Sequence, residues 1–170
     1  IPREFIAYLQ ETRGIRPGDP AFLAELAHYE WVELALSTDE RELVFAAITD
    51  DRADDELLTR PLRPSPLAWP LQYRFPVHRI RHEFQPTAAP AEPTFLLVYR
   101  DRADEVRFIE LNAVSARLFG LLCEHADDTH YTGRQALETI AAELRHPRPE
   151  HVFAHGKELL RDWQARGILR

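Results

Sequence analysis

The sequence predicts an α+β fold, in which an N-terminal helical part is followed by a small antiparallel sheet and a winged-helix-like module of three helices. Three observations predict it: apolar residues at helical spacing near the start, two β-type runs around a polar loop at 101–104, and three capped helical patterns after residue 112. With 170 residues, 45% of them hydrophobic, the chain is long enough for one ordinary domain or two small ones.

The first expected helix lies near the start of the chain. Pro2 suits a first helical position and Gly14 suits a stop, so they bracket a short helix. Phe5, Ile6 and Leu9 would share one face of this helix.

A second helix is expected after Asp19, which suits an N-cap, and Pro20, which suits the first turn. This helix is apolar over much of its circumference. Its apolar residues are Phe22, Leu23, Leu26, Ala27, Tyr29, Trp31, Val32, Leu34 and Leu36. A helix of this kind either lies centrally in the fold or binds a second partner.

Prolines dominate the middle of the chain. Five of them between residues 61 and 76 exclude a helix and favour extended backbone. Leu71, Tyr73 and Phe75 alternate with polar residues, which predicts a half-buried strand, and the flanking prolines place that strand at a sheet edge. Residues 85–93 resemble a stiff linker, and the acidic run 50–56 is expected to be a solvated loop.

The last part of the chain has the clearest pattern. Thr94–Arg100 and Glu105–Leu111 are expected to be the two strands of a hairpin. Asn112 would cap a first helix, Thr132 with Gln135 would form a capping box for a second, and a third would run from Pro149 to Gly167. The predicted organisation is therefore a helical part at 1–60, a proline-rich segment with an edge strand at 61–93, and a module at 94–170.

The net charge of −7 lies in the first part of the chain, because residues 1–70 contain 7 Arg and 14 Asp plus Glu. Nucleic-acid binding is disfavoured, since it usually requires a basic face. The third helix of the module also has mixed charge, with Lys157, Arg161, Arg166, Glu150, Glu158 and Asp162. No apolar run approaches the ~20 residues of a membrane span, and no signal segment is evident, so no membrane association is expected.

The sequence lacks the common catalytic and metal-binding motifs. The sequence contains no phosphate-binding glycine loop, nucleophile elbow or Cys-x-x-Cys pair. His78 and His82, and separately His151 and His155, stand four apart but lack an evident third ligand, so surface or capping roles are expected. The single Cys123 sits in an apolar helical pattern, which indicates a core residue and fits a reducing cytoplasm.

Three segments closely resemble the HvfC and BufC proteins: residues 26–35 (LAHYEWVELA), 65–78 (SPLAWPLQYRFPVH) and 93–100 (PTFLLVYR). Those proteins are partners of methanobactin-type multinuclear iron enzymes, which oxidise cysteines of ribosomally made peptides. The resemblance implies a non-catalytic partner protein with no cofactor of its own, iron and copper belonging to the enzyme and the modified peptide. The family usually begins with a further helical domain, and the sequence has no initiator Met, so we expect the chain to be part of a longer protein.

Residues 108–112 and the three following helices also resemble the precursor-peptide recognition modules of peptide-modifying pathways. That likeness implies an extended peptide added to an exposed strand edge. Its geometry would place the peptide along Val106, Phe108 and Glu110 and against Val152, His155, Leu159 and Trp163. The alternative is that the chain's own proline-rich segment closes this groove.

The iron enzyme would dock on the first helical part, whose broadly apolar helix has surplus hydrophobic surface. The residues expected to bind it are His28, Tyr29, Glu30, Trp31 and Trp69. A buried, hydrogen-bonded carboxylate is the alternative for Glu30. The competing function is a winged-helix transcription regulator, because family members often carry a DNA-binding label.

Overall fold

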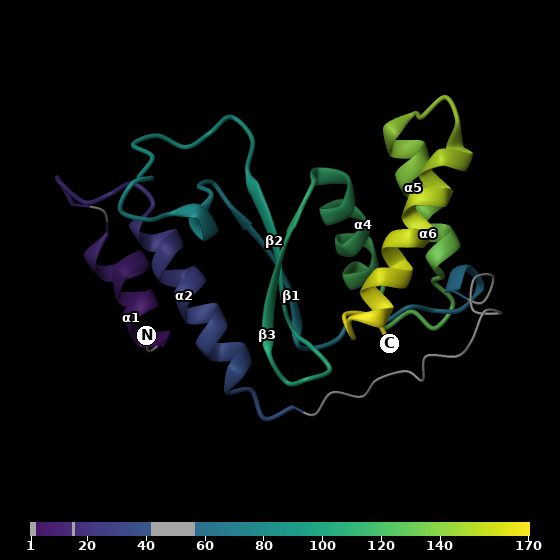
Figure 1. Cartoon of the computed structure of the whole chain (residues 1–170), viewed down its shortest axis with the longest axis horizontal. Coiled ribbons are helices and arrows are strands. Elements are labelled where there is room, and N and C mark those ends of the chain that lie inside the picture. Colours follow the sequence, from purple (N-terminus) through teal and green to yellow (C-terminus); the bar gives the residue numbers. More distant parts are fainter. Residues whose placement is uncertain (1–2, 15, 42–56) are drawn as a thin grey trace.

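The computed structural model describes residues 3–14, 16–41 and 57–170. A three-stranded antiparallel sheet lies between two groups of helices (Figure 1). The helix α2 (Leu23–Ser37) covers one face, and α1 (Arg3–Ala7) packs on the outer side of α2. The helices α4 (Ala113–Glu124), α5 (Gly133–Leu144) and α6 (Pro149–Ala165) cover the other. The α+β class is thus confirmed, and the predicted helical part, sheet and three C-terminal helices are all present.

The sheet has the order β1-β2-β3, with β1 at Ala68–Tyr73, β2 at Thr94–Arg100 and β3 at Val106–Leu111. The central strand β2 is covered on both faces: Leu96 and Val98 pack with α2, while Leu97 and Tyr99 pack with the C-terminal helices. Burial on both sides explains why residues 95–99 form a continuous apolar run rather than an alternating one.

The expected caps of the C-terminal module are confirmed. The Asn112 side chain accepts the N–H of Ser115 at 2.8 Å, and Thr132 with Gln135 forms the capping box of α5. The hairpin turn closes around Asp101, whose carboxylate accepts the N–H groups of Ala103 and Glu105. These local contacts let short sequence patterns specify the hairpin and the starts of α4 and α5, whereas α6 begins at Pro149 without a side-chain cap.

In the N-terminal part, the predicted stop of the first helix at Gly14 is confirmed, and the predicted cap of the second helix is wrong. The first helix continues as a π-helical stretch, η1 (Tyr8–Arg13), and stops at Gly14, whose φ is 63°. Asp19 does not cap the second helix, because α2 begins four residues later. Its carboxylate instead binds the Arg13 guanidinium at 2.6 and 2.8 Å, and this contact lowers the pKa of Asp19 to about 2.

The edge strand lies earlier in the chain than predicted. It runs from Ala68 to Tyr73 and includes Pro70, whereas Phe75 lies beyond it and donates its N–H to Glu25 of α2. Before the strand, Arg63 exchanges backbone hydrogen bonds with Arg170 at the chain's end. The acidic run 50–56 lies outside the described residues. Among the described residues, β1, β2 and β3 form one sheet.

A buried arginine fixes α2 to the sheet. Arg100, at the end of β2, is 7% exposed and donates to the carbonyl oxygens of Leu36, Asp39 and Arg41. These carbonyls end or follow α2, so the guanidinium supplies donors to the C-terminal end of the helix, where intrahelical partners run out. The position of α2 against the sheet is therefore set by hydrogen bonds as well as by apolar packing.

Candidate functional site

The outer edge of β3 is unpaired in the part of the chain that the structure describes. Two backbone hydrogen bonds show which residues of β2 bond to which neighbouring strand. The Arg100 N–H donates to the Leu67 carbonyl, on the side of β1, and the Asp101 N–H donates to the Glu105 carbonyl, on the side of β3. In an antiparallel pair, every second residue bonds the same neighbour. In the observed register, residues 107, 109 and 111 therefore bond β2. The N–H and C=O groups of Val106, Phe108 and Glu110 point outward.

The other edge of the sheet is closed. By the same alternation, Ala68, Pro70 and Gln72 of β1 point outward. Pro70 has no N–H, and the N–H of Ala68 already donates to Ser65 at 3.0 Å. The prediction that this strand lies at a sheet edge is confirmed, and Pro70 together with the Ala68–Ser65 bond hinders further pairing there.

The alternative, in which the chain's own proline-rich segment closes the groove, is not observed as strand pairing with β3 among the described residues. Pro64 of this segment pairs with Leu169 at the C-terminus, and β1 pairs with β2 on the side away from β3. This first part of the segment thus lies at the opposite edge of the sheet from β3, whereas His78 and Arg79, further along it, contact the Glu110 side chain of β3. The backbone of β3 is left accessible to an added strand.

The side chains of the outward-pointing residues lie on the face of α2, not on the face of α6. Val106 and Phe108 join the cluster around α2, and the Phe108 ring lies 5.1 Å from that of Tyr29. Glu110 accepts from Arg79 at 2.6 Å, and this guanidinium lowers the pKa of the carboxyl. The expectation that these side chains share a groove with α6 is therefore corrected. The residue of β3 that packs towards α4–α6 is Ile109.

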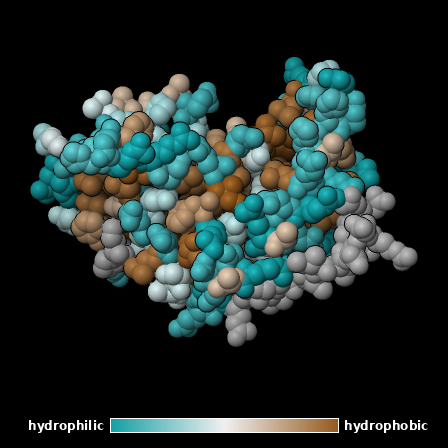
Figure 2. All heavy atoms as spheres, in the orientation of Figure 1, coloured by the Kyte–Doolittle hydropathy of each residue, from teal (hydrophilic) through white to brown (hydrophobic). Residues whose placement is uncertain are grey.

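A hollow of about 460 Å³ lies between α4, α5 and α6. Figure 2 shows it as a notch with apolar side chains on its wall. Three of the expected peptide-binding residues, Val152, His155 and Leu159, line it from α6. Asn112, which follows the last residue of β3, lines it from the other side, so the pocket begins where the open edge ends.

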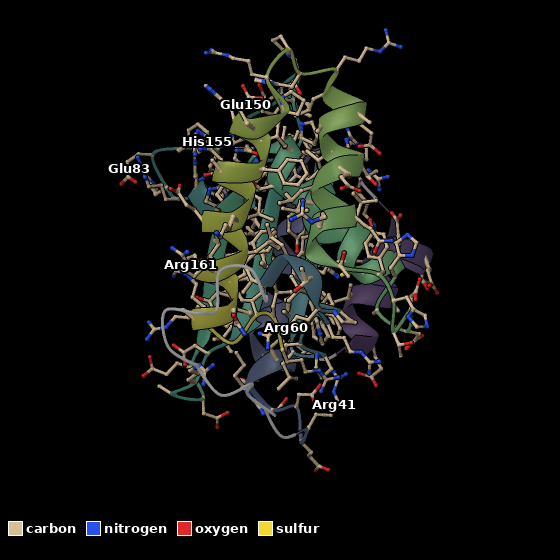
Figure 3. The ribbon with its side chains drawn as sticks, turned by 90° about the vertical axis from the view of Figure 1, so that its right-hand side faces the viewer. Arg41, Arg60, Glu83, Glu150, His155 and Arg161 are labelled. Carbon is tan, nitrogen blue, oxygen red and sulfur yellow. The ribbon has the colours of Figure 1, made fainter. Side chains whose placement is uncertain are left out.

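Trp163, the fourth expected residue of α6, is placed differently. It has no exposed surface and packs edge-to-face on Phe119, with ring centroids 5.2 Å apart. A side chain in this position supports the pocket from behind and does not contact a bound peptide, which corrects the expectation for Trp163. Figure 3 labels Glu150, His155 and Arg161 along α6, whose charged residues have both signs.

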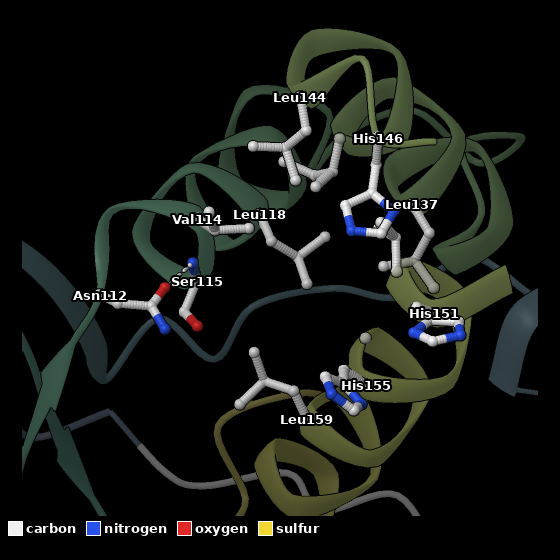
Figure 4. Close-up of a pocket in the computed structure, with 13 residues that line it drawn as sticks. Asn112, Val114, Ser115, Leu118, Leu137, Leu144, His146, His151, His155 and Leu159 are labelled. Carbon is white, nitrogen blue, oxygen red and sulfur yellow. Dashed lines mark hydrogen bonds between the residues drawn. The ribbon is translucent and has the colours of Figure 1, made fainter. Parts of the chain in front are cut away.

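The sequence did not identify every residue that lines the pocket. Val114 of α4 and Leu144 of α5 are apolar but 40% and 46% exposed, and both border it (Figure 4). Three imidazoles, of His146, His151 and His155, also border it. An indication was present in the sequence, because Val114 and Leu144 are large apolar residues at the outer ends of their helices, where burial is least expected.

Most of the residues expected to bind the enzyme pack against the sheet. His28 Nδ1 lies 2.9 Å from the Tyr73 hydroxyl, burial lowers the pKa of His28, and the Trp31 and Trp69 rings are 6.3 Å apart. Only Glu30 of this set is exposed, so the alternative of a buried Glu30 carboxylate is wrong. The apolar surface left open by the helical part lies instead at Phe5, Tyr8 and Leu34, which are 43%, 43% and 45% exposed.

The histidine pairs do not form a metal site in the described residues, among which no group of three or more metal-ligating side chains was found. His78 lies in the short 3-10 turn η2 (Val77–Arg79) and contacts Glu110, while His82 is exposed. Cys123 packs against the core, and burial raises its thiol pKa to about 11. The thiol is therefore protonated at neutral pH.

The described chain is thus an α+β protein with one open sheet edge beside an apolar pocket. Residues 65–164 match the HvfC C-terminal domain, and the chain belongs to that family. The family resemblance seen in the sequence is confirmed, whereas the likeness to precursor-peptide recognition modules stays a prediction. No match was found among curated proteins. None of the helices in the described residues is long and apolar enough to cross a membrane.

Proposed function

We propose that this chain is a non-catalytic partner protein that binds a ribosomally made precursor peptide and presents it to a multinuclear non-haem iron enzyme. The enzyme would oxidise the peptide's cysteines, and the iron would belong to the enzyme. The observation that carries the proposal is the open edge of β3 at Val106, Phe108 and Glu110. Membership of the HvfC family supports an accessory role.

The backbone of the peptide would supply most of the affinity. Each outward residue of β3 offers one N–H and one C=O to an added strand. A hydrogen bond of this kind contributes about 0.5–1.5 kcal/mol net, so several in a row give a stable but sequence-tolerant contact. The edge therefore explains how one protein could hold a flexible peptide without reading every side chain.

The pocket between α4, α5 and α6 would supply the specificity. Its lining from Val152, Leu159 and Val114 is apolar, and it lies at the end of β3. Burying one large aliphatic or aromatic side chain contributes about 1.5–3 kcal/mol. We therefore expect the peptide to carry such a side chain where it passes the end of the strand.

The charge of the chain supports a peptide rather than DNA as the ligand. The formal net charge is −7, and α6, which would be the recognition helix of a DNA-binding protein, carries Glu150, Glu158 and Asp162. Asp162 also neutralises Arg166 through an ion pair of 2.7 Å. A DNA-binding helix would need an excess of basic side chains on its exposed face.

Gel filtration of the chain with the iron enzyme and the precursor peptide tests the proposal. The expected result is a single complex that contains all three, with peptide modification by the enzyme strongly dependent on the chain. Separate peaks at micromolar concentration, together with full modification by the enzyme alone, would remove the proposed role. The same preparation without enzyme should show no turnover of the peptide.

A further inference from the structure

A second apolar groove lies on the opposite side of the molecule, between the first helix and α2. It has a volume of about 440 Å³ and is lined by Phe5, Tyr8, Leu26 and Ala27, with Glu30 at its border. Apolar side chains gather over α1 and α2 at the left of Figure 2. An open patch of large apolar residues on one face is typical of a protein-binding surface.

The groove is distinct from the core that holds the two helices together. Ile6, Leu9 and Ala27 are buried and form a small cluster with Trp31. Phe5 and Tyr8 lie on the other face of the same helix and are each 43% exposed. The contact between α1 and α2 therefore does not bury the aromatic side chains of Phe5 and Tyr8.

Glu30 lines the groove, and further exposed carboxylates lie on the two elements that form it. Glu4 and Glu11 lie beside Phe5 and Tyr8 along α1 and η1, at helical spacing. Glu30 and Glu33 lie on α2, and all four carboxylates are exposed. None of them has an ion-pair partner among the described residues.

The arginine nearest to the groove does not balance this charge. Arg13 lines the groove, but its guanidinium binds the carboxylate of Asp19 through both terminal nitrogens, at 2.6 and 2.8 Å. Among the described side chains, the groove therefore presents an apolar floor with unpaired carboxylates on its two helices. Such a surface attracts a cationic partner and repels nucleic acid and anionic lipid.

We infer that this groove binds an amphipathic helix of another protein. The apolar side chains of that helix lie between Phe5 and Tyr8 on one side and Leu26 and Ala27 on the other. Its Lys or Arg residues lie opposite Glu30 and Glu33. A helix packing between two helices buries the most apolar area, and three turns match the length of α1 and η1 at about 1.5 Å per residue. In terms of the proposed function, the helix belongs to the iron enzyme, and this assignment rests on that proposal.

The test uses two labelled synthetic helices of about twelve residues, one with Leu at helical spacing and Lys at the flanking positions, the other with Glu in place of Lys. Fluorescence anisotropy with the full chain should show micromolar binding of the Lys helix, weakened by salt, and at least about tenfold weaker binding of the Glu helix. The double variant Glu30→Lys/Glu33→Lys should reverse this preference. Glu138→Lys, an exposed residue on α5, is the matched control and should leave both affinities unchanged.

Equal binding of the two helices, or a preference that survives Glu30→Lys/Glu33→Lys, would overturn the inference. So would light scattering that shows a dimer of the chain lost in Phe5→Ser, because the groove would then be covered by a second copy.

Replacing the probe by the iron enzyme separates the two proposals. Enzyme binding that ignores the Glu30→Lys/Glu33→Lys change removes the inference and leaves the proposed function intact. Binding of the Lys helix without binding of the enzyme supports the groove and removes the enzyme as its occupant.

Discussion

The two edges of the sheet differ in a way that bears directly on function. At β1, Pro70 lacks a donor, and Ala68 already donates to Ser65. At β3, no proline interrupts the strand, and Val106, Phe108 and Glu110 direct their backbone groups outward. Proteins usually protect edge strands because an open edge pairs with other chains. A protein that protects one edge and leaves the other open can add a strand in one place only.

The two faces of β3 also differ in the helices that they contact. The residues that offer their backbone outward pack their side chains on α2 and η2, as the contacts of Phe108 with Tyr29 and of Glu110 with Arg79 show. The apolar pocket, by contrast, is built by α4, α5 and α6. Affinity through the backbone and selectivity through the pocket therefore come from different parts of the fold.

The largest expected effect distinguishes inward from outward residues of β3. Ile109 pairs with Leu97 and directs its N–H into the ladder, so Ile109→Pro should lower the free energy of unfolding by about 3 kcal/mol or more. Val106→Pro should change it little, because its N–H points outward. Denaturant titration measures both, and Ile109→Ala corrects for the lost side chain. Equal destabilisation by the two prolines would contradict the assignment of the edge.

The next effect concerns peptide affinity at the two edges. Val106→Pro removes a donor from the open edge and should weaken binding of the precursor's leader segment by about 1–3 kcal/mol in calorimetric titration. Gln72→Pro makes the same change at an outward position of β1 and should leave the affinity unchanged. If a folded Val106→Pro protein binds the peptide normally, the peptide site lies elsewhere.

The smallest effect concerns the turn that holds the open edge in place. The pKa of Asp101 is lowered, mainly by its hydrogen bond from Arg107, so its folded pKa lies below its unfolded one. Its contribution to stability is therefore present above the unfolded pKa and is lost as the pH falls through the folded pKa. Thermal melts between about pH 5 and about pH 3 should show a steeper loss of stability in the wild type than in Asp101→Asn. Parallel curves would show that the turn does not depend on this carboxylate.

The C-terminal fold could be predicted because its determinants are local. The turn at Asp101, the cap at Asn112 and the capping box at Thr132 each act within a few residues of sequence. The N-terminal part was harder, because Asp19 is drawn away from capping by Arg13. The end of β1 was misplaced because Phe75 extends the alternating pattern but donates its N–H to Glu25 of α2, a contact that no local pattern reveals.

The site could be predicted only in part for the same reason. Val106, Phe108 and Glu110 were placed on the correct strand, but the sheet face of their side chains depends on which neighbour the strand pairs with. Trp163 and Leu159 are four residues apart on α6, yet one is buried and the other lines the pocket. Only the packing of α4 and α5 against α6 determines which of these two side chains is accessible.

Amide hydrogen exchange, measured residue by residue with and without the precursor's leader peptide, tests the central claim most directly. In the free chain, the amides of Val106, Phe108 and Glu110 should exchange quickly, and those of Arg107 and Ile109 slowly, because only the latter donate within the sheet. Bound peptide should protect the three outward amides and leave Gln72 at the closed edge unchanged. Saturating peptide that leaves Val106, Phe108 and Glu110 unprotected would contradict strand addition at β3.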